Sequence, residues 1–147
     1  MEALTTHGAL FLVSMLAATI LPGSSEAALL ALITREPHQA ITFTATATVG
    51  NTLGAIINWG LGRWLSFYAD RRWFPATPKQ LQKASELFRR YGVWSLLFSW
   101  VPIVGDPLTV IAGVLKVPFV PFAILIALGK LARYILLIGA WRAIVGF

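Results

Sequence analysis

Two carboxylates occupy positions where an apolar sequence tolerates charge least. Glu26 closes the segment PGSSE (22–26) and Asp106 closes PIVGD (102–106), so each acid follows a proline by four residues inside a long hydrophobic stretch. An ionisable group at such a place is costly in lipid and usually marks an ion or substrate pathway. Two acids in corresponding positions indicate two halves of a chain built around one site.

Two roles are open for these acids. As protonatable groups in a low-dielectric cavity, Glu26 and Asp106 would exchange protons while a substrate passes and would gate the cavity. Alternatively, each acid would cap the half-helix that follows its turn, where the positive end of the helix dipole stabilises negative charge. Asp106 directly precedes Pro107, which favours capping there. The two roles are compatible.

A pair of cations lies in the last apolar stretch. Lys130 and Arg133 are three residues apart and therefore share one helix face. They would pair with Glu26 and Asp106, or they would hold a phosphate head group, which matches the planar guanidinium of arginine. A purely structural ion pair, or side chains that extend to the membrane surface, is the alternative.

Four further polar residues lie in the apolar stretches. Arg63 and Arg142 are near the ends of their segments, where they would bind head groups or simply reach the surface. Asn51 and Asn58 are seven residues apart and share a face. They would line a polar path or bridge neighbouring helices by hydrogen bonds.

The composition is that of a membrane protein. Of the 147 residues, 57% are hydrophobic and 12% are charged, whereas soluble domains carry roughly 25% charged residues. The formal charge of +6 favours anionic lipid over nucleic acid as a partner, because the charges flank apolar stretches. The chain has no cysteine, and His7 and His38 fall near the ends of apolar segments. We therefore expect no metal site, no cofactor and no enzymatic activity.

Proline and glycine divide the apolar sequence into hairpins and spans. Residues 27–34, after the first break, would form a helix of about 12 Å, far short of the roughly 30 Å core of a bilayer. The first apolar stretch therefore predicts a re-entrant hairpin, and the stretch broken by Pro102 and Pro107 predicts a second one. The expected order is hairpin 3–33, span 40–62, connector 63–90, hairpin 94–115 and span 117–147.

The two halves of the chain resemble each other. An offset of 79 residues superposes Gly50 on Gly129, Gly60 on Gly139 and Arg63 on Arg142, whereas the acidic motifs match at an offset of 80. The segment order is that of an inverted repeat, whose hairpins enter from opposite faces and meet near the midplane. The predicted fold is an all-α integral membrane protein. It is one domain, with inverted repeats at about 3–63 and 91–147 joined by an amphipathic connector at 64–90. The expected hairpin tips contain Pro22, Gly23, Pro102, Gly105 and Pro107.

The first span carries a ridge of small and polar residues. The ridge consists of residues at every fourth position: Thr42, Thr46, Gly50, Gly54, Asn58 and Gly62. Such a ridge lets helices approach closely in lipid. It would serve a protein partner or a second copy if the chain were a membrane scaffold.

The connector is basic and rich in aromatic residues. Thr77 and Pro78 form a helix start. The apolar face of this helix would consist of Leu81, Ala84, Phe88 and Tyr91. We expect a short amphipathic helix that ends near Gly92 and lies on the membrane surface. The positive-inside rule places the connector 63–90 in the cytoplasm and both termini on the other side.

Five stretches of the chain are informative together: LPGSSE at 21–26, VGN at 49–51, GLGR at 60–63, FRRYG at 88–92 and VPIVGDPLTVIAG at 101–113. They resemble the DedA superfamily, also called the SNARE-associated Golgi or VTT-domain family, and most closely its short YqaA-like branch. The resemblance covers nearly the whole chain. It implies two re-entrant hairpins and lipid transport, by flipping or scrambling of phospholipid or return of undecaprenyl phosphate across the bacterial inner membrane, with a dependence on the proton-motive force.

The resemblance also concerns site residues. Acidic and arginine residues near the hairpins are functional groups of the family, and Glu26 and Arg63 match them by position. Typical members carry an arginine two residues before the second-hairpin proline and another three residues after it. This chain has Trp100 and Gly105 there, so Lys130 and Arg133 would have to supply the charge.

The leading hypothesis is an inner-membrane flippase or scramblase, with membrane lipids and protons as partners. One alternative is a proton-coupled carrier for a small solute or ion, which would enclose a water-filled path. Another is a non-transporting membrane scaffold. A homo-oligomer is compatible with each of the three.

Overall fold

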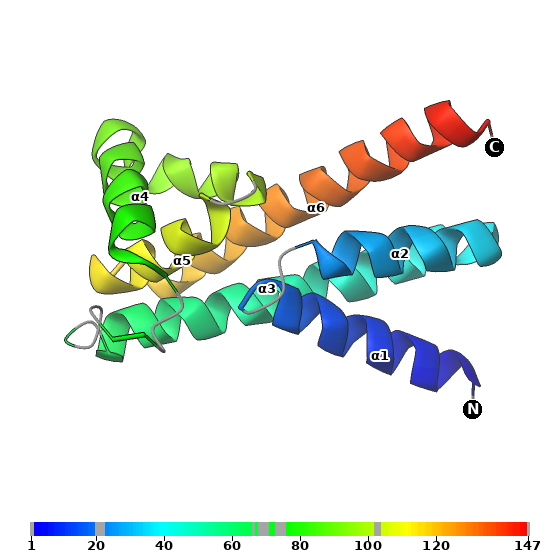
Figure 1. Ribbon diagram of the computed structural model, residues 1–147, viewed down its shortest axis with the longest axis horizontal. Coiled ribbons are helices and arrows are strands. Elements are labelled where there is room, and N and C mark those ends of the chain that lie inside the picture. Colours follow the sequence, from blue (N-terminus) through cyan, green and yellow to red (C-terminus); the bar gives the residue numbers. More distant parts are fainter. Residues whose placement is uncertain are drawn as a thin grey trace.

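The described part of the chain is helical throughout. A computed structural model describes residues 2–19, 23–65, 67, 71–72, 76–101 and 104–146. No strand occurs among these residues, which confirms the all-helical prediction. The elements, shown in Figure 1, are α1 (Glu2–Ala17), α2 (Ser24–Arg35), η1 (Pro37–Gln39), α3 (Ala40–Leu65), α4 (Pro78–Tyr91), η3 (Gly92–Trp100), α5 (Gly105–Val114) and α6 (Phe119–Val145).

Two helices in the described residues are long and apolar enough to cross a membrane. α3 has 26 residues and α6 has 27, so each is about 40 Å long and exceeds the roughly 30 Å hydrocarbon core of a bilayer. They run in opposite directions along the molecule and diverge toward the end where both termini lie (Figure 1). The spans predicted at 40–62 and 117–147 are thus confirmed as apolar helices of spanning length.

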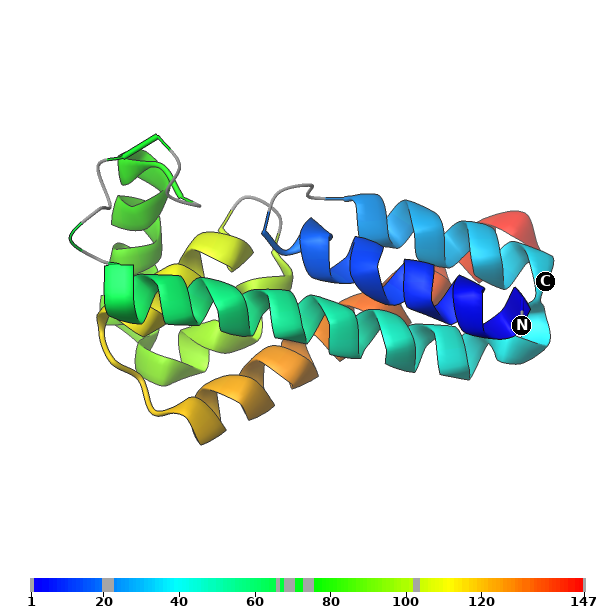
Figure 2. The same ribbon diagram turned by 90° about the horizontal axis from the view of Figure 1, so that it is seen from below.

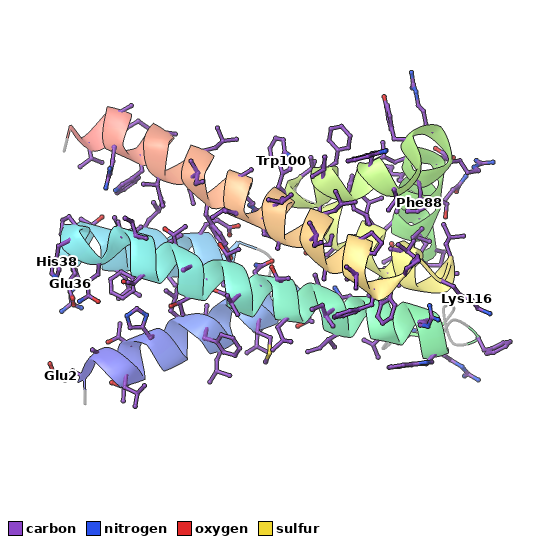
Figure 3. The ribbon with its side chains drawn as sticks, turned by 180° about the vertical axis from the view of Figure 1, so that it is seen from behind. Glu2, Glu36, His38, Phe88, Trp100 and Lys116 are labelled. Atoms are coloured by element: carbon purple, nitrogen blue, oxygen red, sulfur yellow. The ribbon has the colours of Figure 1, made fainter. Side chains whose placement is uncertain are left out.

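The helices α1 and α2 form a hairpin along the first half of α3. Its open end lies at the end of the molecule where α3 begins, and its closed end lies near the middle of α3 (Figures 1 and 2). Glu2, at the start of α1, and Glu36, just after α2, lie together at that outer end (Figure 3). Both arms of this hairpin therefore open toward the same end of the molecule.

The second hairpin, formed by η3 and α5, has the opposite orientation. Trp100, at the inner end of η3, lies near the middle of the molecule, whereas Lys116, just after α5, lies at the far end (Figure 3). Pro22 and Pro102, which the sequence places at the hairpin tips, lie outside the described residues. Pro107 lies within the first turn of α5, not in the preceding turn, because α5 begins at Gly105.

The first arm of the second hairpin is a 3-10 helix, which the sequence analysis does not predict. A 3-10 helix rises about 2.0 Å per residue against about 1.5 Å in an α-helix. Its nine residues therefore reach roughly 18 Å, where an α-helix of the same length would reach about 14 Å. The extra reach lets this short arm extend to the middle of the molecule.

The ridge of small residues on α3 is used within the chain. Gly54 lies against α1, where an added Cβ atom would be 3.2 Å from the carbonyl carbon of Met15. Gly62 lies against α5, where an added Cβ would be 2.9 Å from the carbonyl carbon of Val110. α3 thus packs closely on one arm of each hairpin. The ridge residues from Gly50 to Gly62 are buried within the chain, whereas Thr42, at the start of the ridge, is exposed.

The connector helix α4 matches the expected bounds. It begins after Thr77 with Pro78 in its first turn and ends at Gly92. Leu81 and Phe88 pack on a cluster that contains Leu108 of α5 and the buried Ala84. Tyr91 is exposed. The apolar face predicted to lie on a membrane surface is therefore covered in large part by α5.

A capping box holds the start of α4. The Gln80 backbone N–H donates to the Thr77 hydroxyl at 3.3 Å, and the Thr77 N–H donates to the Gln80 side-chain oxygen at 2.8 Å. Thr77→Ala should cost about 1 kcal/mol, so the first-turn amides should exchange with deuterium roughly five times faster. Thr77→Ser keeps the hydroxyl and should exchange like wild type. Unchanged protection in Thr77→Ala would contradict a stabilising cap.

Candidate functional site

A polar cavity of about 230 Å³ separates two apolar cores. One core joins Ala55 and Trp59 of α3 to Phe122 and Ile126 of α6. The other joins residues 40–47 of α3 to the α6 residues Tyr134 and Ile138. The cavity lies between the two and is lined by Ala17, Gly23, Ser25, Glu26, Asn51, Ser99, Val101, Asp106, Lys130 and Arg133. The inner ends of both hairpins thus meet α3 and α6 there.

Lys130 pairs with Asp106 across this cavity. The Lys130 Nζ atom lies 3.1 Å from Asp106 Oδ1, and the exposed fractions of the two side chains are 3% and 34%. Asp106 is in the first turn of α5, but the N-cap of that helix is Val104 and no side chain caps it. Asp106 is therefore not the N-cap residue, but its place in the first turn keeps the favourable interaction with the dipole of α5.

Arg133 pairs with Glu26 in the same cavity. Glu26 lies in the first turn of α2, whose N-cap is Gly23 with no side-chain cap, so Glu26 is not the N-cap residue either. Gly23 has φ +90°, a conformation that glycine adopts without steric cost. That left-handed residue starts α2 and thereby directs Glu26 into the cavity.

One face of α6 therefore binds both hairpins. Lys130 and Arg133 are three residues apart on α6 and contact acids from α5 and α2, respectively. Ion pairing was one of the alternatives that the sequence left open, and it is the arrangement found. The four charged groups sum to zero, which lowers the cost of placing them in an apolar protein.

The two asparagines of α3 have different surroundings. Asn51 lines the cavity and is 4% exposed. Asn58 lies outside the cavity, where its Nδ2 donates to the carbonyl oxygen of Ala18 at 2.8 Å. Asn58 thus forms a hydrogen bond to the segment after α1, as the bridging role requires, and Asn51 faces the cavity. The offset that superposes Gly50 on Gly129 also superposes Asn51 on Lys130.

Several polar atoms at the cavity have no hydrogen-bond partner in the described part of the chain. They are Glu26 Oε2, Asn51 Oδ1 and Ser99 Oγ. Buried polar atoms are rarely left unpaired in native proteins, so such atoms mark a place for water or a ligand's polar group. A cavity of this size is below the roughly 300–1,000 Å³ of drug-sized ligand sites, so it fits water or a small head group.

Two of the four predicted cations do not reach the cavity. The Arg63 guanidinium lies 5.2 Å from the ring centre of Trp59. Arg142 borders an apolar groove between α3 and α6. The two positions at which the family resemblance implies arginine supply no charge to the cavity either. Trp100 is 38% exposed, and Gly105 is buried against Ser99.

A buried hydroxyl that was not predicted from the sequence lies beside the ion pairs. Tyr134 of α6 is 1% exposed, lies near Ser25 and Glu26, and has a hydroxyl with no hydrogen-bond partner among the described residues. Tyr134 follows Lys130 by four residues, and this spacing places both on one helix face. The four-residue spacing from Lys130 could have predicted that Tyr134 lies beside the ion pairs.

The chain is similar to several known proteins. The model of a family described as the VTT domain matches residues 8–142. The inner membrane protein YqaA of Escherichia coli (strain K12) is 38% identical over 134 residues, which cover 91% of this chain and 89% of that protein. An uncharacterized protein of Haemophilus influenzae is 37% identical over 136 residues, 88% of this chain and 83% of that one.

A more distant relative carries a functional name. Undecaprenyl phosphate transporter A of Staphylococcus aureus is 27% identical over 107 residues, which cover 67% of this chain and 53% of that protein. No solved structure matches the chain significantly.

Proposed function

The chain belongs to the VTT-domain family of membrane proteins, and on that premise we propose that it moves phosphate-bearing lipids across the bacterial inner membrane. The lipid would be a phospholipid or undecaprenyl phosphate, the latter being the substrate named for the Staphylococcus aureus relative. The protein would act as a flippase or scramblase, with proton exchange at the cavity acids.

The position of the ion-pair cavity carries the proposal. It lies midway along the two helices of spanning length, between the inner ends of the two hairpins, as its lining residues on each element show. In the proposed arrangement α3 and α6 cross the bilayer, and each hairpin enters and leaves at one face. Charges at that depth are costly in lipid and are typical of a transport path. A phosphate would then cross the bilayer centre beside Lys130 and Arg133.

The chemistry of the cavity allows an exchange of partners. A lipid phosphate would bind the Arg133 guanidinium through two parallel hydrogen bonds, as arginine commonly binds phosphate. Glu26, released from Arg133, would take up a proton, so the cavity would stay neutral while it holds a phosphate with one negative charge. Loss of that proton would restore the ion pair and expel the head group. The lipid tails would remain in the bilayer during this exchange.

Close packing in the two halves supports an inverted repeat. Gly50 of α3 lies against Phe11 of the first hairpin, where an added Cβ would be 3.2 Å from the Phe11 carbonyl carbon. Gly129 of α6 lies against the second hairpin, where an added Cβ would be 3.0 Å from the Leu97 oxygen. Gly50 and Gly129, which correspond in the sequence, thus make corresponding contacts, each with the first arm of one hairpin.

The distribution of charge supports one orientation. The end of the molecule near the connector carries Arg63, Arg71, Arg72, Lys79, Lys83, Arg89, Arg90 and Lys116. The opposite end has Arg35 and Arg142, with Glu2 and Glu36 nearby. We therefore place the connector end in the cytoplasm, following the positive-inside rule.

The size of the cavity is also compatible with a second function. A volume of about 230 Å³ holds a small anion entirely, as a proton-coupled solute carrier would require. The scaffold alternative has less support, because most of the small-residue ridge on α3, from Gly50 to Gly62, is buried within the chain.

Lipid translocation in reconstituted vesicles tests the proposal. The substrates are short-chain fluorescent phospholipids and an undecaprenyl phosphate analogue. Glu26→Gln, Asp106→Asn and Arg133→Ala should each lower the rate at least about tenfold, since each removes a charge that the exchange needs. Glu86→Gln makes the same chemical change on the exposed side of α4 and should leave the rate unchanged.

Three outcomes separate the alternatives. Wild-type rates in all three cavity variants would show that the cavity is not the transport site. Failure of the wild-type protein to move any of these lipids would contradict lipid transport. In that case, proton-linked uptake of inorganic phosphate into the same vesicles would favour the solute carrier.

A further inference from the structure

A second, apolar opening lies between α3 and α6 at the end of the molecule that holds both termini. The two helices diverge toward this end (Figures 1 and 3). The groove between them has a volume of about 480 Å³. Its walls are formed mainly by small or aliphatic side chains, among them Ala40 and Ala45 of α3 and Gly139 of α6. It shares no lining residue with the ion-pair cavity.

The opposite end of the same helix pair is closed. There Trp59 of α3 lies 5.7 Å from Phe119 and 5.8 Å from Phe122 of α6, measured between ring centres. The Trp59 indole N–H also donates to the Val117 carbonyl at 3.1 Å. Aromatic rings therefore fill the space between α3 and α6 at this end of the molecule, whereas alanine and glycine leave that space open at the other end.

The groove ends at a cation. Arg142, in the last turn of α6, lines the groove and is exposed. Within the described residues it forms no ion pair. Its counterpart in the first half, Arg63, is instead placed over the ring of Trp59. The Arg142 guanidinium therefore keeps its hydrogen-bond donors for a ligand.

We propose that this α3–α6 groove binds one acyl chain of a phosphate-bearing membrane lipid whose head group is held by Arg142. Helices of spanning length are surrounded by lipid tails, so an acyl chain is the apolar partner present at such a groove. Arg142 lies near the end of its helix, at the level where lipid head groups lie. Arginine binds phosphate with two parallel hydrogen bonds. This site does not depend on transport, because a lipid would bind there whether or not the cavity carries one.

Photo-crosslinking in vesicles tests the site. The probe is phosphatidylglycerol with a photoreactive group on one acyl chain, compared with a diacylglycerol that carries the same chain but no phosphate. Label is located by mass spectrometry of peptides that contain residues 40–45 and 135–142. Phosphatidylglycerol should label these peptides of the wild-type protein roughly tenfold more than diacylglycerol, because it adds charge-assisted hydrogen bonds.

Three variants give the expected pattern. Arg142→Gln should remove the difference between the two lipids. Gly139→Phe should fill the groove and reduce labelling by both, since a Cβ at Gly139 meets no atom within 4 Å and the helix can keep its place. Gly8→Phe is the matched control, because Gly8 is also an exposed helical glycine with free space but lies outside the groove. It should label like wild type.

Other results would overturn the proposal. Equal labelling of the wild-type protein by the two lipids, or a lipid preference that survives Arg142→Gln, would show that Arg142 does not bind the phosphate. Unchanged labelling in Gly139→Phe would show that the chain does not enter the groove. If Gly139→Phe fails to fold, Ala45→Phe fills the groove from α3, and its labelling by the two lipids tests the same prediction.

Discussion

Asp106→Ala should strongly destabilise the folded protein. The substitution leaves the Lys130 ammonium, whose side chain is 3% exposed, without its counter-charge. Removing one partner of a buried ion pair commonly costs about 3–5 kcal/mol, because the remaining charge has lost both water and partner. Thermal unfolding in detergent, followed by tryptophan fluorescence, should show a marked fall in midpoint. Glu26→Ala should cost less, since the Arg133 side chain is 23% exposed.

A double variant separates the structural role of this pair from its transport role. Asp106→Asn combined with Lys130→Met removes both charges while it roughly keeps the side-chain volumes. Replacing a buried pair by uncharged groups is often neutral for stability, so most of the lost stability should return. Lipid translocation should not return, because the cavity has lost a cation. A midpoint for Asp106→Ala equal to that of wild type would show that Lys130 finds solvent or another partner.

Gly105→Ala should prevent the second hairpin from closing. An added Cβ at Gly105 would lie in contact with the Ser99 carbonyl oxygen and 2.6 Å from its carbon. Both atoms belong to the backbone, so they move only if η3 and α5 separate. Overpacking of this kind costs about 3 kcal/mol or more, and the yield of folded protein after detergent extraction should fall accordingly.

The contact between Gly105 and the Ser99 backbone also concerns the arginine that the resemblance to DedA members implies at position 105. Gly105→Arg, which introduces the arginine that the family resemblance implies for this position, should fold no better than Gly105→Ala, because its Cβ meets the same backbone. Gly8→Ala is the control: an added Cβ there meets no atom within 4 Å, and alanine should gain up to about 1 kcal/mol in helix propensity. Normal folding of Gly105→Arg would mean that the hairpin can open at this point without loss.

The sequence by itself predicted the class of protein and the order of its segments. Low charge content and uninterrupted apolar stretches identify spanning helices at 40–62 and 117–147 because these signals are local and summed over many residues. The start of α4 at Thr77 and Pro78 was predicted for the same reason, since capping depends on neighbours within one turn. The helix face shared by Lys130 and Arg133 likewise follows from their spacing alone.

Only the tertiary structure decided which of these residues meet. Lys130 and Asp106 are 24 residues apart, and Arg133 is still farther from Glu26, so no local period relates them. Their pairing arises because two hairpins from opposite ends reach the same face of α6. That packing also separates Asn51, which faces the cavity, from Asn58, which binds Ala18, although both follow the same helical period. Spacing determines which side chains share a face, and the packing of distant segments determines what that face contacts.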